Sequence, residues 1–172
     1  MPRNVKPKNA ARNEVAYTNY RQYWGLIPKH LANRSYVEVI TSVEKIILAR
    51  LWTFLNELTP HNTGDMSYHD STFKGLIKLW KKYEPLPIKD KRFDDLQQAV
   101  EKWREKRNRG AHAGLKRVQG QKLLAFDELQ EKNKAAAEEG ILIAKSVQNW
   151  LDRVKYRAEK KEGKSLTNPR HK

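Results

Sequence analysis

The feature that most constrains the fold is a long run of apolar residues spaced three and four positions apart. Between Ser35 and Thr59 this spacing is occupied by Val37, Ile40, Val43, Ile46, Ile47, Trp52 and Leu55. The period matches one face of an α-helix rather than the two-residue alternation of a strand. Asn33 or Ser35 can cap the helix, with Glu38 completing a capping box. Thr59-Pro60 ends it, so we expect a helix of roughly 24 residues.

Shorter stretches with the same period predict further helices. The first covers about residues 14–24 and ends before Gly25 and Pro28, and the second covers 71–83 after a cap at Asp70 or Ser71. The third runs from about residue 93 into the 104–112 stretch, and the last covers 127–156. No long strand-like alternation and no internal repeat is present. The chain is therefore predicted to be all-α, an up-down bundle of four to five helices. Residues 1–12 are expected to form a flexible basic arm, 13–160 the helical domain, and 161–172 a flexible basic tail.

The composition excludes several classes of protein. The chain has no cysteine, which removes disulfides, thiolate metal sites and a cysteine nucleophile. No segment approaches the length of apolar sequence that crosses a bilayer, and the first residues lack the apolar core of a signal peptide. We therefore expect a cytoplasmic protein without a membrane partner.

The net charge favours a polyanionic partner. Thirty-five Lys and Arg residues against 20 Asp and Glu give a formal charge of +15. A field of this size attracts nucleic acid, although an acidic protein partner or simple solubility would also account for it. Charge alone does not show whether such a partner is only bound or is also cut.

Most of the sequence lacks the motifs of known catalytic or metal sites. None of the five histidines stands in an HExxH arrangement. His61, Asp65, His69 and Asp70 could meet across one turn-rich segment, but solvated polar side chains are the simpler interpretation. No phosphate-binding loop or nucleophile elbow is present. Neither a metal nor a cofactor is predicted.

One short stretch, REKRNRGAH at residues 104–112, has two interpretations. In the simpler one it is the basic last turn of a helix, with Gly110 as the left-handed residue that ends it. In the other it carries the groups that metal-free RNA cleavage needs. A histidine titrates near neutrality, an arginine neutralises charge on phosphoryl oxygens, and an amide positions one or the other. His112, Arg107 and Asn108 supply these three groups.

The spacing of these residues makes a geometric prediction. Asn108 and His112 are four residues apart and would share one face of a continuous helix. Arg107 and His112 are five residues apart, which separates them by about 140° around the helix axis. They would converge only if the helix broke or tightened between them, and Gly110 lies where that break is expected.

At these residues the chain resembles the HEPN superfamily, whose all-α ribonucleases carry an Arg-x4–6-His motif that often begins Arg-Asn. The matching residues here are Arg107-Asn108-Arg109-Gly110-Ala111-His112. The resemblance implies a homodimer in which the motifs of two copies face each other across a cleft. It also implies metal-independent cleavage, by attack of the ribose 2′-OH on the adjacent phosphate.

The resemblance further implies roles for individual residues. His112 would be the general acid or base, Arg107 would stabilise the phosphate, and Asn108 would orient the motif or the RNA. Arg104, Lys106 and Arg109 would hold RNA beside the site. Such proteins often act as toxins or in antiviral defence, under the control of an antitoxin or regulatory partner. Two alternatives remain: a non-catalytic helical module that binds RNA or other nucleic acid, and a structural bundle that pairs with an acidic protein.

Overall fold

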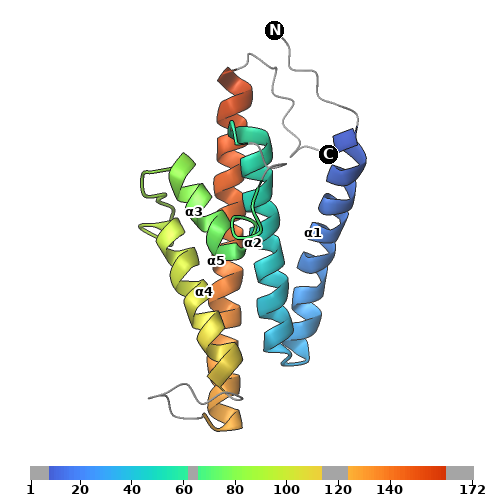
Figure 1. Cartoon of the computed structure of the whole chain (residues 1–172). Coiled ribbons are helices and arrows are strands. Elements are labelled where there is room, and N and C mark those ends of the chain that lie inside the picture. Colours follow the sequence, from blue (N-terminus) through green and yellow to red (C-terminus); the bar gives the residue numbers. More distant parts are fainter. Residues whose placement is uncertain (1–7, 62–65, 114–123, 162–172) are drawn as a thin grey trace. The chain divides into compact units, whose positions relative to one another are not determined.

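The computed structural model describes residues 8–61, 66–113 and 124–161. Over these residues the chain has five α-helices and no strand (Figure 1). The helices are α1 (Lys8–Ala32), α2 (Tyr36–Leu58), α3 (Phe73–Tyr83), α4 (Leu96–Ala113) and α5 (Phe126–Lys161). The prediction of an all-α bundle of four to five helices is confirmed.

The flexible arm and tail expected from the sequence are only partly covered by the described residues. Residues 8–12 belong to α1, so this part of the arm is helical, in contrast to the expectation. Helix α5 likewise continues to Lys161. Residues 1–7 and 162–172 of the arm and tail lie outside the described residues.

The chain divides into two compact units. Unit 1 comprises residues 1–49 and 103–141, and unit 2 comprises residues 50–102 and 142–172. Helices α2, α4 and α5 each contribute one segment to each unit. The REKRNRGAH stretch belongs to unit 1.

Helix α1 is longer than the sequence predicts. Gly25 and Pro28 lie inside it rather than beyond its end. Proline in a helix interior removes one hydrogen bond and costs about 3 kcal/mol. Next to it, Ile27 is buried with 4% of its surface exposed, and this packing offsets part of that cost. Tertiary packing here outweighs the local preference of Pro28.

The end of α1 is set by Arg34, which adopts a left-handed backbone with φ 56°. The Arg34 N–H donates to the carbonyl of Leu31 at 3.0 Å, and the Ser35 N–H donates to the carbonyl of His30 at 2.8 Å. This pair of bonds is the Schellman arrangement, in which glycine is the usual left-handed residue. Helix α2 then begins directly after Ser35, one of its two predicted caps.

In unit 1, α4 and α5 approach closely at one tryptophan. Trp103 is fully buried, and its indole N–H donates to the carbonyl of Ala136 on α5 at 2.8 Å. A Cβ atom added at Gly140 would lie 2.7 Å from the Trp103 ring, so only glycine allows this approach. The contact fixes the start of the α4 segment that carries the motif.

The core of unit 2 is aromatic. The ring centroid of Trp150 on α5 lies 4.9 Å from that of Phe54 on α2 and 4.9 Å from that of Trp80 on α3. All three side chains are buried. The unit 2 segments of α2 and α5 therefore meet α3 at these rings.

Two helix starts in unit 2 differ from the sequence prediction. Helix α3 is capped by Thr72 rather than Asp70 or Ser71, because the Thr72 hydroxyl accepts the N–H of Gly75 at 3.1 Å. Helix α4 begins at Leu96 rather than near residue 93, after Asp95, whose carboxylate accepts the N–H of Gln97 at 3.0 Å. In each case the residue whose side chain reaches the free N–H groups of the first turn sets the boundary.

No helix in the described parts of the chain combines the length and apolar character needed to cross a membrane.

Candidate active site

The Arg-Asn-x3-His motif lies at the end of α4. The backbone stays helical through Gly110 and His112 and ends at Ala113. The predicted break at Gly110 is therefore wrong, as is the interpretation of Gly110 as the residue that ends the helix. Glycine inside a helix costs only about 1 kcal/mol relative to alanine, which the neighbouring turns can absorb.

Arg107 is held by a carboxylate on another helix. Its Nη2 atom donates to Oε1 of Glu44 on α2 at 2.6 Å. The two side chains are only 24% and 19% exposed, so the ion pair is partly shielded from water. The Nε atom of Arg107 is buried and has no hydrogen-bond partner. The guanidinium is therefore anchored through Nη2, and its Nε is shielded from solvent.

Lys106 ties the same turn of α4 to α5. Its ammonium group lies 2.9 Å and 3.1 Å from the two carboxylate oxygens of Glu139. The Lys106 side chain is 60% exposed, so this pair is screened by water more strongly than the Arg107–Glu44 pair. The end of α4 is thus fixed on two sides, to α2 by Arg107 and to α5 by Lys106.

Arg104 lies one turn before Arg107 and is nearly covered. Its side chain is 14% exposed, and its closest carboxylate is Oε1 of Glu105, 3.9 Å from Nη2. The Nε atom is buried without a hydrogen-bond partner. Little of this side chain can reach an RNA phosphate, although the sequence suggested it as an RNA contact. Lys106, a second suggested contact, already pairs with Glu139.

The structure brings Arg107 and Asn108 together at the half-buried end of α4. The side chains of Arg109 and His112 lie outside the described residues. Because the backbone is helical from residue 107 to 112, the positions of Arg107 and His112 are about 140° apart around the axis. Within one chain, regular helix does not turn Arg107 and His112 toward the same point.

Glu44 is the site residue that the sequence analysis missed. It lies four residues after Ile40 and three before Ile47, and both of these side chains are buried. A carboxylate at helical spacing from buried positions requires a cationic or hydrogen-bonding partner. That spacing signals the need for a partner but cannot identify Arg107, which lies 63 residues away.

No cluster of three or more potential metal ligands occurs among the residues that the structure describes. His61, considered above with Asp65 and His69, instead places Nδ1 3.2 Å from the hydroxyl of Tyr83. Asp65 lies outside the described residues.

Comparison with known proteins gives no relatives: no family model, no curated protein and no solved structure matches the chain.

Proposed function

We propose that the protein is a metal-independent endoribonuclease of the HEPN type that acts through Arg107, Asn108 and His112. The observation that carries the proposal is the state of Arg107. Arg107 lies one turn and a half before His112 on a continuous helix; Glu44 fixes its guanidinium, and 24% of its side chain remains exposed. A cation anchored in this way is suited to neutralising charge that develops on a phosphate.

In the proposed reaction the ribose 2′-oxygen attacks the adjacent phosphorus and the bond to the 5′-oxygen breaks, leaving a 2′,3′-cyclic phosphate. A histidine accepts the proton of the 2′-OH, and a protonated histidine donates one to the 5′-oxygen. Arg107 stabilises the phosphoryl oxygens and Asn108 orients the RNA or the histidine. We further propose a cytoplasmic role as a toxin or anti-phage effector, controlled by an antitoxin or regulatory partner.

A homodimer is part of the proposal. Arg107 and His112 are separated by about 140° on one helix, so a single motif cannot surround one phosphate. A cleft between the motifs of two copies would bring the arginine of one chain near the histidine of the other.

The same continuous helix favours a second candidate, a non-catalytic helical module that binds RNA. Without a dimer, Arg107 and His112 remain apart, so the motif residues could contact RNA phosphates without forming a catalytic site.

The test is cleavage of tRNA and total RNA in EDTA, with identification of the product ends. We expect cyclic phosphate ends with the wild type, and a loss of about 100- to 10,000-fold in rate with His112→Ala and Arg107→Ala. Lys102→Ala is the matched control, because Lys102 is exposed on the same helix and outside the motif. Cleavage that persists in His112→Ala, or no cleavage by a dimeric wild type, would contradict the proposal.

A further inference from the structure

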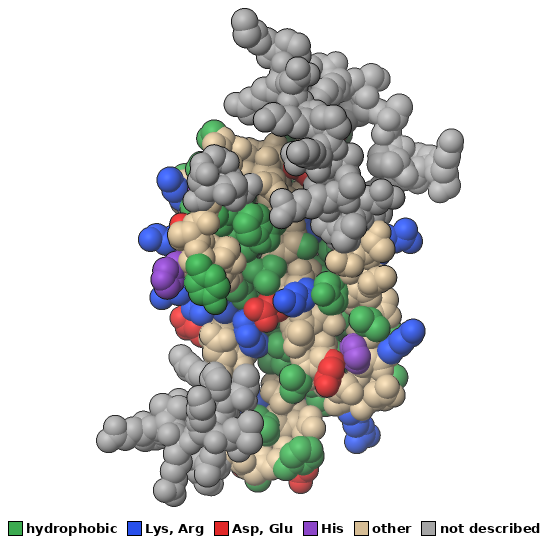
Figure 2. Space-filling view, turned by 45° about the vertical axis from the view of Figure 1, so that its right-hand side comes forward, with side chains coloured by type: hydrophobic (Ala, Val, Ile, Leu, Met, Phe, Trp, Pro, Cys, Tyr) green, Lys and Arg blue, Asp and Glu red, His purple; other side chains and the backbone are tan. Residues whose placement is uncertain are grey.

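On the face that Figure 2 draws, the described Lys and Arg side chains form no single basic field. Figure 2 shows Lys and Arg side chains scattered among hydrophobic and acidic ones over the face that it draws. Local groups of cations, rather than the net charge of +15, therefore decide where nucleic acid can bind.

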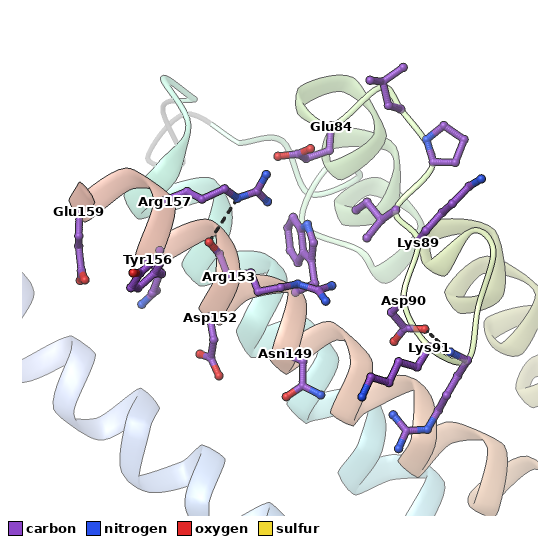
Figure 3. Close-up of a pocket in the computed structure, with 16 residues that line it drawn as sticks. Glu84, Lys89, Asp90, Lys91, Asn149, Asp152, Arg153, Tyr156, Arg157 and Glu159 are labelled. Carbon is purple, nitrogen blue, oxygen red and sulfur yellow. Dashed lines mark hydrogen bonds between the residues drawn. The ribbon is translucent and has the colours of Figure 1, made fainter. Parts of the chain in front are cut away.

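Unit 2 contains a groove between residues 84–92, which follow α3, and residues 149–159 of α5 (Figure 3). Its volume is about 1460 Å³. That exceeds the roughly 300–1,000 Å³ of pockets that enclose small molecules. Leu86 and Tyr156 on its walls are 75% and 52% exposed, so the groove is open to solvent. These dimensions fit a polymer better than a small ligand.

The basic side chains of this groove converge. Arg153 and Arg157 extend from α5 toward the facing segment, and Lys91 extends from that segment toward α5 (Figure 3). None of these three side chains forms an ion pair with a described residue. Arg153 and Arg157 are one turn apart, about 6 Å along the axis, which is close to the spacing of neighbouring phosphates in an extended strand.

Most acidic side chains of the groove either accept hydrogen bonds from within the chain or point away from the facing segment. Asp152 and Glu159 point away from the facing segment (Figure 3). Asp152 also accepts the Nε2 amide of Gln148 at 2.7 Å. Asp90 accepts the backbone N–H groups of Arg92 and Phe93 at 2.7 Å and 2.8 Å. Among the described lining residues, Glu84 remains as a carboxylate without such a partner.

We propose that this groove binds single-stranded RNA, with Lys91, Arg153 and Arg157 contacting successive phosphates. Exposed Tyr156 and Leu86 offer apolar surface to unstacked bases, which a duplex does not present. This proposal rests on the proposed function in one respect: the polyanion that the groove binds is taken to be RNA. The groove lies within unit 2, and its residues are distinct from those of the motif in unit 1.

The test uses full-length protein and a fluorescent single-stranded RNA that is 2′-O-methylated, so that it cannot be cleaved through the 2′-OH. Binding is measured by anisotropy over a range of salt concentrations. We expect Arg153→Gln/Arg157→Gln to weaken binding at least about tenfold. The slope of log affinity against log salt should flatten by about 1.4, twice the value of about 0.7 per phosphate contact for single strands.

Matched variants separate the groove from net charge and from folding. Lys78→Gln/Lys145→Gln removes the same charge from exposed positions of unit 2 outside the groove and should leave affinity within about twofold. Glu84→Gln should tighten binding by about threefold, because it removes a repulsive charge from the groove. Circular dichroism confirms that each variant is folded.

Equal losses in the groove and control variants, or duplex RNA that binds as tightly as the single strand, would overturn the inference. So would a wild type that binds a polyglutamate peptide but not the RNA. Because the probe cannot be cleaved, failure of the ribonuclease proposal would leave this binding result unchanged.

Discussion

Arg107 and Lys106 near the end of α4 in unit 1 pair with carboxylates of the described residues, whereas Lys91 and Arg153 in the groove of unit 2 do not. Arg107 contacts Glu44 and Lys106 contacts Glu139, each on a neighbouring helix. Arg153 and Lys91 contact no carboxylate of the described chain. An anchored guanidinium is suited to one defined position near a reacting phosphate, whereas unpaired surface cations are suited to holding a variable strand.

The cores of the two units differ as well. Unit 2 depends on contacts between the large rings of Phe54, Trp80 and Trp150. Unit 1 depends on the close approach of Trp103 to Gly140. Each arrangement can be disrupted separately by a substitution in its own unit.

The largest expected loss of stability comes from the ring cluster of unit 2. Trp150→Ala removes the ring that contacts both Phe54 and Trp80, and should lower the free energy of unfolding by about 3–5 kcal/mol. Urea denaturation measures the change. A loss below about 1 kcal/mol would show that the rings do not hold unit 2 together.

In unit 1 the close contact between Trp103 and Gly140 can be disrupted by adding a methyl group at Gly140. Gly140→Ala places Cβ 2.7 Å from the Trp103 ring and should cost about 1–3 kcal/mol. Gly25→Ala is the control, because a Cβ there meets no atom within 4 Å, and it should stabilise α1 by up to about 1 kcal/mol. Thermal unfolding should move in opposite directions for the two variants, and a shift in the same direction would refute the close contact.

The two ion pairs of α4 should differ in strength. Glu44→Ala leaves the partly buried Arg107 cation without its carboxylate and should cost about 1–3 kcal/mol. Glu139→Ala leaves the exposed Lys106 in water and should cost less than about 1 kcal/mol. Equal losses in urea denaturation would indicate that burial does not distinguish the two pairs.

The two fully buried tryptophans should respond differently to phenylalanine. Trp103→Phe breaks the hydrogen bond to the Ala136 carbonyl, which should add about 1–3 kcal/mol to the cost of the smaller ring. Trp80→Phe removes an indole N–H that is buried without a partner, so no such cost is added. Thermal unfolding compares them, and a larger loss for Trp80→Phe would be inconsistent with these contacts.

The smallest expected effect concerns the pH dependence of Asp90. Burial opposes ionisation of this carboxyl, but hydrogen bonds to the carboxylate, including those from the N–H groups of Arg92 and Phe93, and the Arg92 charge outweigh it, so its pKa lies below the ordinary 3.8. Its contribution to stability is therefore present above about pH 4 and is lost as the pH falls through the lowered native pKa.

Asp90→Asn should remove that acidic part of the dependence. The thermal midpoint of the variant is expected to fall less steeply with decreasing pH than that of the wild type. Identical slopes below about pH 4 would contradict the lowered pKa.

Sequence periodicity predicted the class of the fold and the location of α2, because α2 has regular apolar spacing and clear boundary residues at Ser35 and Thr59-Pro60. Boundaries that depend on tertiary contacts were not predictable. Packing around Ile27 keeps Pro28 inside α1, and Arg34 occupies a left-handed position where glycine is usual. Thr72 replaces Asp70 or Ser71 as a cap because its hydroxyl reaches the Gly75 N–H.

The candidate site was predictable only in part. The motif residues stand together in the sequence, and the sequence indicated the helix that carries them. The Glu44 partner lies on another helix, and the continuous backbone at Gly110 depends on a modest local cost that the surrounding helix absorbs. The groove of unit 2 joins residues about 60 positions apart, so no local pattern could reveal it.

The most direct test of this division of roles is single-turnover cleavage of one RNA in EDTA by wild type, His112→Ala and Arg153→Gln/Arg157→Gln. Two quantities are measured for each protein: the cleavage rate at saturating protein, and the protein concentration that gives half of that rate. We predict that His112→Ala abolishes the saturating rate while still binding the RNA. The groove variant should keep that rate and require at least about tenfold more protein. Loss of the saturating rate in the groove variant, or an unchanged rate in His112→Ala, would contradict the account.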